Sequence, residues 1–359
     1  MLELSRLYRP GRLSPVIALL LVALSLPALA APRVVTDVTP VHSLVAQVMA
    51  GVAEPQLVIQ PGASPHRYSM RPSEAAALEQ ADVVFWMGEP LTPWLGRALG
   101  NLAPDARVVS LLAAEDTQRY AFRDRVLSAA EADDHHDHDH DHDAADDHHD
   151  HNHGAADDHH DHDHGAADDH HDHDHGAADD HHDHDHAGTD PHAWLDPVNA
   201  RYWLAVIAQT LAAEDPANAD AYRRNAAAGQ ARIDALLDSV EAAVEPVREK
   251  AFIVFHDAYQ YYERRFGMNA VGAIALSDAS DPGPAHIARI QAIVDAHDVT
   301  CVFAEPQFNP GLVETVARDT PARTGVLDPL GSDIATGPDF YPALINELTA
   351  RLVDCLQGA

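Results

Sequence analysis

Short apolar runs alternate with amphipathic segments in the part of the chain that begins near Arg33. Four runs rich in Val, Ile and Leu are predicted as strands: Arg33–Val38, Gln56–Gln60, Ala81–Met87 and Arg107–Leu111. Val41–Val52 lies between the first two and carries apolar residues at helical spacing, and Arg71–Gln80 is predicted as a second helix. This β-α-β-α order predicts a mostly parallel sheet covered by helices.

Two Asp-Pro pairs mark the next helix starts. Asp196-Pro197 is typical of an N-cap and a first helical residue, and predicts a helix that ends near Glu214. Asp215-Pro216 begins a second helical pattern that runs to about Val244, with apolar residues three or four positions apart. About 29 residues at 1.5 Å each give a helix about 43 Å long, which suits a connection between two lobes.

The alternation of strands and helices then starts again. The predicted strands are Ala251–Phe255, Ala270–Leu276, Val299–Ala304 and Arg323–Leu327, and the predicted helices are Pro284–Ala296, Pro310–Arg318 and Asp339–Leu356. We therefore expect an α/β protein with two lobes, each with a mostly parallel sheet flanked by helices, joined by one long rigid helix. The expected division is a signal peptide at 1–30, an N-terminal lobe at 31–214 with an insert at 131–189, a linking helix at 215–247 and a C-terminal lobe at 248–359.

The first thirty residues have the pattern of a secretory signal peptide. Three arginines precede the apolar run Val16–Leu26, and Ala28-Leu29-Ala30 is a small-x-small cleavage site. The alternative is an uncleaved anchor, which the absence of a stop-transfer pattern disfavours. No other stretch is apolar for long enough to cross a membrane, and no lipid-accepting Cys follows the cleavage site. We expect a free periplasmic protein without stable membrane insertion.

The two cysteines are Cys301 and Cys355. In an oxidising compartment such a pair predicts a disulfide. The alternative is two buried thiols that do not meet.

An insert of His and Asp interrupts the first lobe. Four copies of an eleven-residue unit follow an irregular run, and the stretch Asp133–His186 holds 21 Asp and 21 His. The unit contains no large apolar residue, so a disordered loop is predicted rather than a solenoid. Its imidazoles predict weak binding of several divalent ions, against the alternative of a solvated spacer. We assign this low-affinity role to His135, His136, His138, His148, His149, His159, His160, His170, His171, His181 and His182.

The formal net charge of the chain is −34 with His neutral. Outside Asp133–His186, 36 acidic residues still exceed 23 basic ones. Because binding to phosphates requires clustered Lys and Arg, we expect no nucleic-acid partner.

Four residues outside the insert are candidate metal ligands. His66 and His256 follow predicted strands, one in each lobe, and His192 stands just before a helix. Asp328 also ends a predicted strand. Ligands of open α/β sheets bind beyond the carboxyl ends of the strands. Three neutral imidazoles with a carboxylate or a water suit zinc, whereas Mn²⁺ prefers oxygen.

The sequence motifs around these residues resemble those of one family. They are Gly62–Ser73, Pro191–Pro197, Val254–Tyr259, Cys301–Phe308 and Leu327–Gly331. Together they are similar to the high-affinity zinc-uptake substrate-binding proteins of bacterial ABC transporters, many of which carry a His/Asp-rich insert at this place. The resemblance implies two lobes with a rigid linking helix, Zn²⁺ as the transported ligand in the cleft, and a membrane permease as partner. It also implies that His66, His192 and His256 are zinc ligands.

The sequence leaves two candidates for the fourth ligand. Some zinc members have Glu directly before the first ligand His, where this chain has Pro65. Asp328 matches a carboxylate position of other members, so we favour it over a water. Glu305 follows a predicted strand and is a candidate hydrogen-bond acceptor for a ligand His, or a purely structural one.

The sequence disfavours three other functions. A zinc hydrolase is disfavoured because the chain has no HExxH pair, and we expect no enzyme activity. A manganese or general divalent-metal carrier of the same fold is disfavoured by His256, where manganese members generally have Glu. Zinc buffering or storage through the insert would not require two lobes. We expect a monomer.

Overall fold

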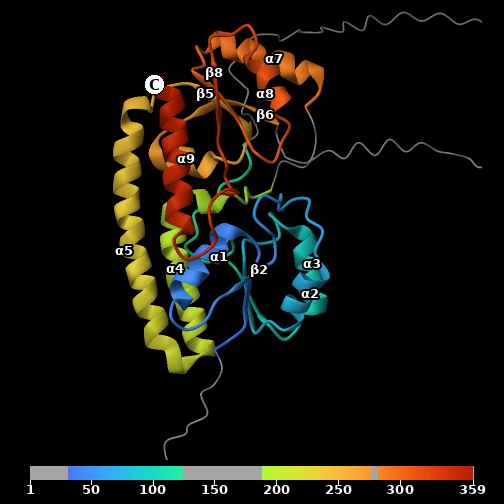
Figure 1. Ribbon diagram of the computed structural model, residues 1–359, viewed down its shortest axis with the longest axis vertical. Helices are drawn as coiled ribbons and strands as arrows, with labels where there is room; N and C mark the ends of the chain where they lie inside the picture. Colours follow the sequence, from blue (N-terminus) through green and yellow to red (C-terminus); the bar gives the residue numbers. More distant parts are fainter. Residues whose placement is uncertain (1–30, 124–187, 276–281, 359) are drawn as a thin grey trace, which may run out of the picture. The chain divides into compact units, whose positions relative to one another are not determined.

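A computed structural model of the chain describes residues 31–123, 188–275 and 282–358. The expected signal peptide, residues 131–187 of the expected insert and all eleven histidines assigned to low-affinity binding lie outside these ranges. Figure 1 shows the described elements, coloured along the sequence.

The first lobe is built on a four-stranded parallel sheet. Its strands are β1 (Val34–Thr36), β2 (Gln56–Leu57), β3 (Val83–Trp86) and β4 (Arg107–Ser110), in the order β2-β1-β3-β4. The helices are α1 (Thr39–Met49), α2 (Pro72–Glu79) and α3 (Pro93–Leu102). Figure 1 shows α1 on one side of this sheet and α2 and α3 on the other. The parallel sheet that the sequence predicted is confirmed.

Two long helices follow, α4 (Pro197–Glu214) and α5 (Ala219–Val244). The Asp196 carboxylate accepts a hydrogen bond from the Val198 amide at 2.9 Å, so this Asp-Pro pair caps α4 as predicted. The second pair does not start α5 directly. It begins a 3₁₀ turn, Pro216–Asn218, in which Asp215 accepts hydrogen bonds from Asn218 and Tyr222.

Helix α5 contacts elements of both lobes. Its 26 residues give a length of about 39 Å. The predicted apolar face is buried, at Ile233, Leu236, Val240 and Val244. It packs against α4 and α1 and against α9 (Phe340–Gln357) (Figure 1).

The second lobe repeats the arrangement of the first. Its strands are β5 (Phe252–His256), β6 (Ala270–Ala275), β7 (Cys301–Ala304) and β8 (Arg323–Val326), all parallel and in the order β6-β5-β7-β8. Its further helices are α6 (Gln260–Phe266), α7 (Pro284–Ala296) and α8 (Pro310–Ala317). Figure 1 shows α7 and α8 on one side of the sheet and α9 on the other.

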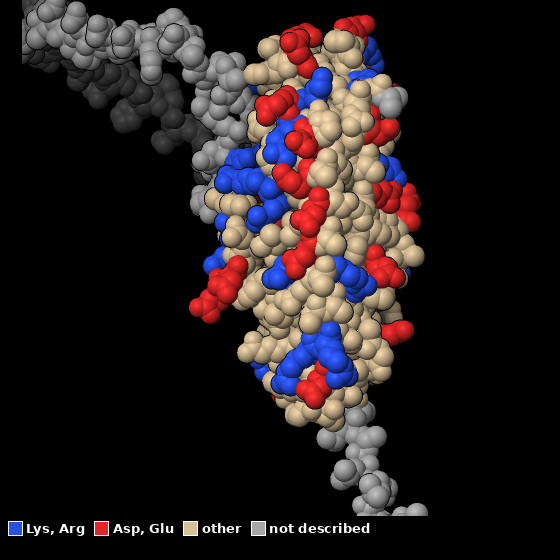
Figure 2. All heavy atoms as spheres, turned by 90° about the vertical axis from the view of Figure 1, so that its left-hand side faces the viewer, with Lys and Arg blue, Asp and Glu red and all other residues tan. Residues whose placement is uncertain are grey.

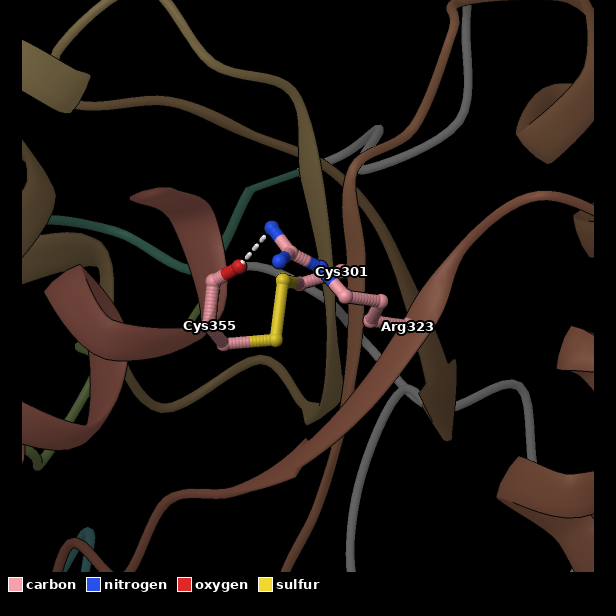
Figure 3. The surroundings of a disulfide bond; sticks show 3 residues. All are labelled: Cys301, Arg323 and Cys355. Carbon is pink, nitrogen blue, oxygen red and sulfur yellow. Dashed lines mark hydrogen bonds between the residues drawn. A yellow bond between two sulfur atoms is a disulfide. The ribbon is translucent and has the colours of Figure 1, made fainter. Parts of the chain in front are cut away.

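The predicted disulfide is confirmed. Cys301 at the start of β7 is bonded to Cys355 near the end of α9, and both residues are buried (Figure 3). Arg323 on β8 donates a hydrogen bond to the Cys355 carbonyl. The bond therefore fixes the last helix of the chain to the sheet of the second lobe.

On the face drawn in Figure 2, acidic and basic side chains are interspersed among uncharged ones rather than gathered in one large basic patch. Among the described residues, no helix combines the length and the apolar character needed to cross a bilayer.

Candidate metal centre

One small cavity gathers the three predicted histidine ligands. His66, His192 and His256 line it together with Trp194, Glu305 and Phe308. Its volume is about 20 Å³. A space of this size holds about one water-sized particle, so it suits a single ion.

His66 lies in the loop between β2 and α2 and is half-buried. Gly62 allows the turn that precedes it, with φ of +81°. The Trp94 indole on α3 donates a hydrogen bond to the Pro65 carbonyl at 2.9 Å. This contact fixes the backbone next to His66.

His192 lies just before the 3₁₀ turn Ala193–Leu195 that leads into α4. Its Nδ1 lies 2.8 Å from Oδ1 of Asp190, and its backbone amide donates to the same oxygen at 3.0 Å. Asp190 is fully buried, and His192 is 5% exposed. Asp190 therefore fixes both the backbone and the ring of His192.

His256 is the last residue of β5, and Glu305 follows the neighbouring strand β7. His256 Nδ1 lies 2.7 Å from Oε1 of Glu305, and the His256 amide donates to the same oxygen at 3.3 Å. Glu305 is thus the hydrogen-bond acceptor for a candidate ligand, as the sequence suggested. The stacking of adjacent parallel strands brings these two residues together.

The two carboxylates determine which ring nitrogens are available. A carboxylate only accepts hydrogen bonds, so the paired Nδ1 atoms of neutral His192 and His256 carry the protons. In that neutral tautomer, Nε2 is the ring nitrogen whose lone pair can coordinate a metal. Such carboxylate–histidine pairs are the usual support of metal-ligating imidazoles.

The spacing of the rings is close to that of a zinc site. The His192 ring centroid lies 5.7 Å from that of His66 and 5.2 Å from that of His256. Two imidazoles on a tetrahedral zinc at about 2.0–2.1 Å would have centroids about 5 Å apart. Within the described ranges no three His, Cys, Asp or Glu side chains already meet in ligating geometry. Ion binding therefore requires a small adjustment of at least one side chain.

Asp328 lies in the loop after β8. Its Oδ1 accepts from the Leu330 amide at 2.9 Å and from Gln307 Nε2 at 3.0 Å, and its Oδ2 accepts from the Ser332 amide at 2.6 Å. Its neighbours Pro329 and Leu330 line the cavity, whereas Asp328 itself does not. The structure thus gives Asp328 the bonds of a turn cap, and ligation by Asp328 stays a prediction.

Tyr259 adds a polar group close to the two carboxylates. Burial raises the pKa of its phenol well above the usual value, and the nearby charges of Glu305 and Asp328 raise it further. Tyr259 therefore stays neutral at any physiological pH, and the negative charge near the cavity comes from carboxylates. That charge favours a cation.

Sequence reasoning did not identify Asp190 or Trp94 as supports of the site. Asp190 stands two positions before His192, and this short spacing was a usable signal. Trp94 gives no such signal, because it reaches Pro65 from 29 positions away through the fold of α3.

Comparisons with known proteins agree with this geometry. Residues 34–355 match the family described as "ZnuA: Zinc-uptake complex component A periplasmic". The chain is 47% identical over 323 residues to the "High-affinity zinc uptake system protein ZnuA" of Brucella abortus, covering 90% of this chain and 91% of the relative. It is 41% identical over 350 residues to the protein of that name from Paracoccus denitrificans, covering 97% and 98%.

Solved structures share the fold. A structure described as "Crystal structure of ZnuA" has a TM-score of 0.64 at 18% identity, covering 90% of this chain and 98% of that one. A mutant of the laminin-binding adhesin Lmb of Streptococcus agalactiae has a TM-score of 0.66 at 22% identity, covering 90% and 99%. At these identities the likeness shows the α/β fold with two lobes.

Proposed function

Because the chain belongs to the family of periplasmic zinc-uptake components, we propose that it holds one Zn²⁺ ion on His66, His192 and His256. It is the zinc-binding component of an ABC importer, and Zn²⁺ is the substrate that it carries. The proposed destination of the ion is the membrane permease of that importer. The family is one of transport proteins rather than enzymes.

One observation carries the ligand assignment. Two of the three cavity-lining histidines each have Nδ1 against a buried carboxylate, at 2.8 Å for His192 and 2.7 Å for His256. Packing alone would not require a buried carboxylate for each ring. This pairing orients neutral imidazoles toward an ion, and three imidazoles favour zinc over manganese.

For the fourth position we keep Asp328 as the proposed ligand, with a water as the alternative. Asp328 does not line the cavity, although its neighbours Pro329 and Leu330 do, so ligation requires the loop 328–332 to shift. A water requires no such shift. The effect of Asp328→Ala on zinc affinity distinguishes the two.

We propose that delivery depends on a loaded form that the permease prefers over the empty one. Because α5 packs against α1 of the first lobe and α9 of the second, we expect small lobe movements and local loop rearrangement. We further propose that the protein acts as a periplasmic monomer.

Calorimetric titration with Zn²⁺ tests the proposal. We expect one tight ion in the full chain and in a variant that lacks 133–186. His66→Ala, His192→Ala and His256→Ala should each weaken this ion by about 100-fold or more, since a zinc site of four ligands is worth about 10–16 kcal/mol.

His286→Ala is the matched control, because His286 lies on α7 and contacts the Ala273 carbonyl instead of the cavity. It should bind zinc as the wild type does. Tight binding that survives all three cavity substitutions would show that the ion binds elsewhere. Loss of tight binding on removal of 133–186 would place the site in the insert.

A further inference from the structure

The support of His192 continues beyond Asp190. Gln260, the first residue of α6, donates through Nε2 to Asp190 Oδ2 at 3.1 Å and to the Ala121 carbonyl at 3.1 Å. The other oxygen of Asp190 holds His192. Gln260 is 1% exposed and stands four positions after His256. One buried amide thus connects the helix that follows one candidate ligand to the carboxylate that orients another.

A second contact joins the same helix to the other side of the insert. Arg123 donates from Nε to Asp257 Oδ2 at 3.1 Å and from Nη1 and Nη2 to Glu263 at 2.9 and 3.0 Å, and Nη2 also donates to Asp257 Oδ1. Asp257 directly follows His256, and Glu263 lies on α6. All three side chains are largely buried, with 17%, 8% and 3% exposure. The guanidinium therefore compensates two buried carboxylates beside a candidate ligand.

The chain segments on the two sides of the insert are bonded to each other. Ala121 and Thr189 form an antiparallel bridge. The Asp190 amide donates to the Tyr120 carbonyl at 2.9 Å. The Tyr261 hydroxyl of α6 accepts from the Tyr120 amide at 3.1 Å and donates to the Asp190 carbonyl at 2.8 Å. These bonds form one short ladder between the two segments. Arg123 and Asp190 are both held against α6 next to this ladder.

We propose that Arg123 and Gln260 are positioning residues of the zinc site. They hold α6 against the chain segments on the two sides of the insert, so that His192 and His256 keep the spacing that one ion requires. This role rests on the proposed function, and neither residue is expected to contact the ion.

The physical reason differs for the two residues. Without Arg123, Asp257 and Glu263 would be buried together without a cation, which favours movement of the turn that holds Asp257. The turn that would move contains His256, whose carbonyl accepts from the Ala258 amide at 2.8 Å. Without the Gln260 amide, the Asp190 carboxylate loses a bond that restrains its rotation. The His192 ring would then lose its fixed orientation.

The same helix offers a matched control. Arg265 on α6 donates twice to the buried carboxylate of Asp196, at 2.7 Å in both bonds. This pair also joins α6 to the first lobe, but the Asp196 side chain caps α4 and bonds to Val198 and Arg265 rather than to a candidate ligand. A purely structural role of ion pairs on α6 would make Arg265→Gln and Arg123→Gln equivalent for zinc binding.

The experiment compares Arg123→Gln, Gln260→Leu and Arg265→Gln in the full chain. Zinc affinity is measured by competition with a chelator of known affinity, Co²⁺ loading by visible absorption, and stability by denaturant unfolding without metal. We expect Arg123→Gln and Gln260→Leu to weaken zinc binding about 10- to 100-fold, the usual effect of removing support from metal ligands. Their Co²⁺ spectra should differ from that of the wild type.

Arg265→Gln should lower stability and leave zinc affinity within about twofold of the wild type. Folded Arg123→Gln and Gln260→Leu proteins that bind zinc as the wild type does would overturn the inference. If Arg123→Gln does not fold, Gln260→Leu decides alone, because it exchanges one neutral side chain for another of similar size. A wild-type chain without a tight zinc ion would instead contradict the proposed function.

Discussion

The two lobes have sheets of the same strand order, and they use the equivalent corner of the sheet, where the two central strands end, in different ways. In the first lobe, the chain passes from β1 outward to β2 and then crosses to β3 on the other side of β1. In the second lobe, it passes in the same way from β5 to β6 and then to β7. In the first lobe, the carboxylate of Asp37 after β1 accepts from the Met87 amide after β3 at 2.8 Å. In the second lobe, His256 at the end of β5 meets the carboxylate of Glu305 after β7.

The difference shows how one fold position acquires a function. Asp37 is fully buried and accepts from two backbone amides, those of Val38 and Met87, so its bonds serve to join two strands. In the second lobe, the Glu305 carboxylate instead accepts from the imidazole of His256, a proposed zinc ligand. Crevices beyond the carboxyl ends of strands at such reversals are the usual ligand sites of open α/β sheets.

The largest expected effect is on zinc affinity, and it distinguishes His256 from Asp37. His256→Ala should weaken zinc by about 100-fold or more. Asp37→Asn should leave the affinity within a few fold, because Asp37 bonds to the backbone of its own lobe. Calorimetry on both variants checks this expectation, and equal losses in the two would show that the corners are not functionally different.

The disulfide is a second difference between the lobes, and it concerns stability. Cys301 and Cys355 are 54 positions apart, and the bond should contribute about 2–4 kcal/mol to the free energy of unfolding. Changing both residues to Ser should lower that free energy in denaturant unfolding and leave zinc affinity unchanged. Wild-type protein with a reductant is the control and should lose a similar amount. An unchanged unfolding midpoint in both samples would contradict the prediction.

Glu305→Gln isolates the carboxylate of the functional corner. The amide oxygen can still accept from His256, but the negative charge that strengthens the bond is lost. We expect zinc affinity to fall about 10-fold, at the lower end of the range for such changes. The same substitution at exposed Glu314 on α8 should have no effect. Zinc binding that is insensitive to Glu305→Gln would reduce Glu305 to a structural residue.

The last prediction concerns Asp37 in the structural corner and depends on pH. Burial raises the pKa of Asp37 from its usual 3.8 to about 7, against the lowering effect of its bonds from backbone amides. The folded state therefore binds a proton that the unfolded state releases between about pH 4 and pH 7. The contribution of Asp37 to stability falls as pH rises through this range, by at most about 1.4 kcal/mol per pH unit.

Asp37→Asn removes this titration. We expect the free energy of unfolding of the wild type to decline relative to that of the variant between about pH 4 and pH 7, in denaturant titrations without metal. Parallel pH profiles of the two proteins would contradict the raised pKa.

The order of strands and helices was predictable because each carries a local pattern. Runs of Val and Ile marked β3 and β5, and Asp196-Pro197 marked the start of α4. Helices α3 and α6 were not predicted. Gly96 and Gly100 weaken the helical pattern of α3, and α6 has only seven residues with three aromatic ones among them.

The candidate ligands were predictable for a different reason from their supports. His66 and His256 follow strands, and motifs surround them in the sequence. Their supports depend on tertiary contacts between distant positions. Arg123 reaches Asp257 across 134 positions, and Glu305 reaches His256 across 49. The candidate ion ligands are therefore easier to identify from sequence alone than the residues that hold them in place.

A crystal structure of the full chain with one equivalent of Zn²⁺ and its anomalous signal tests the central claim most directly. We expect one strong zinc peak at about 2.0–2.1 Å from a nitrogen of each of His66, His192 and His256. In the same map His192 should remain bonded to Asp190, and His256 to Glu305. A peak that contacts fewer than two of the three histidines, or that lies outside this cavity, would contradict it.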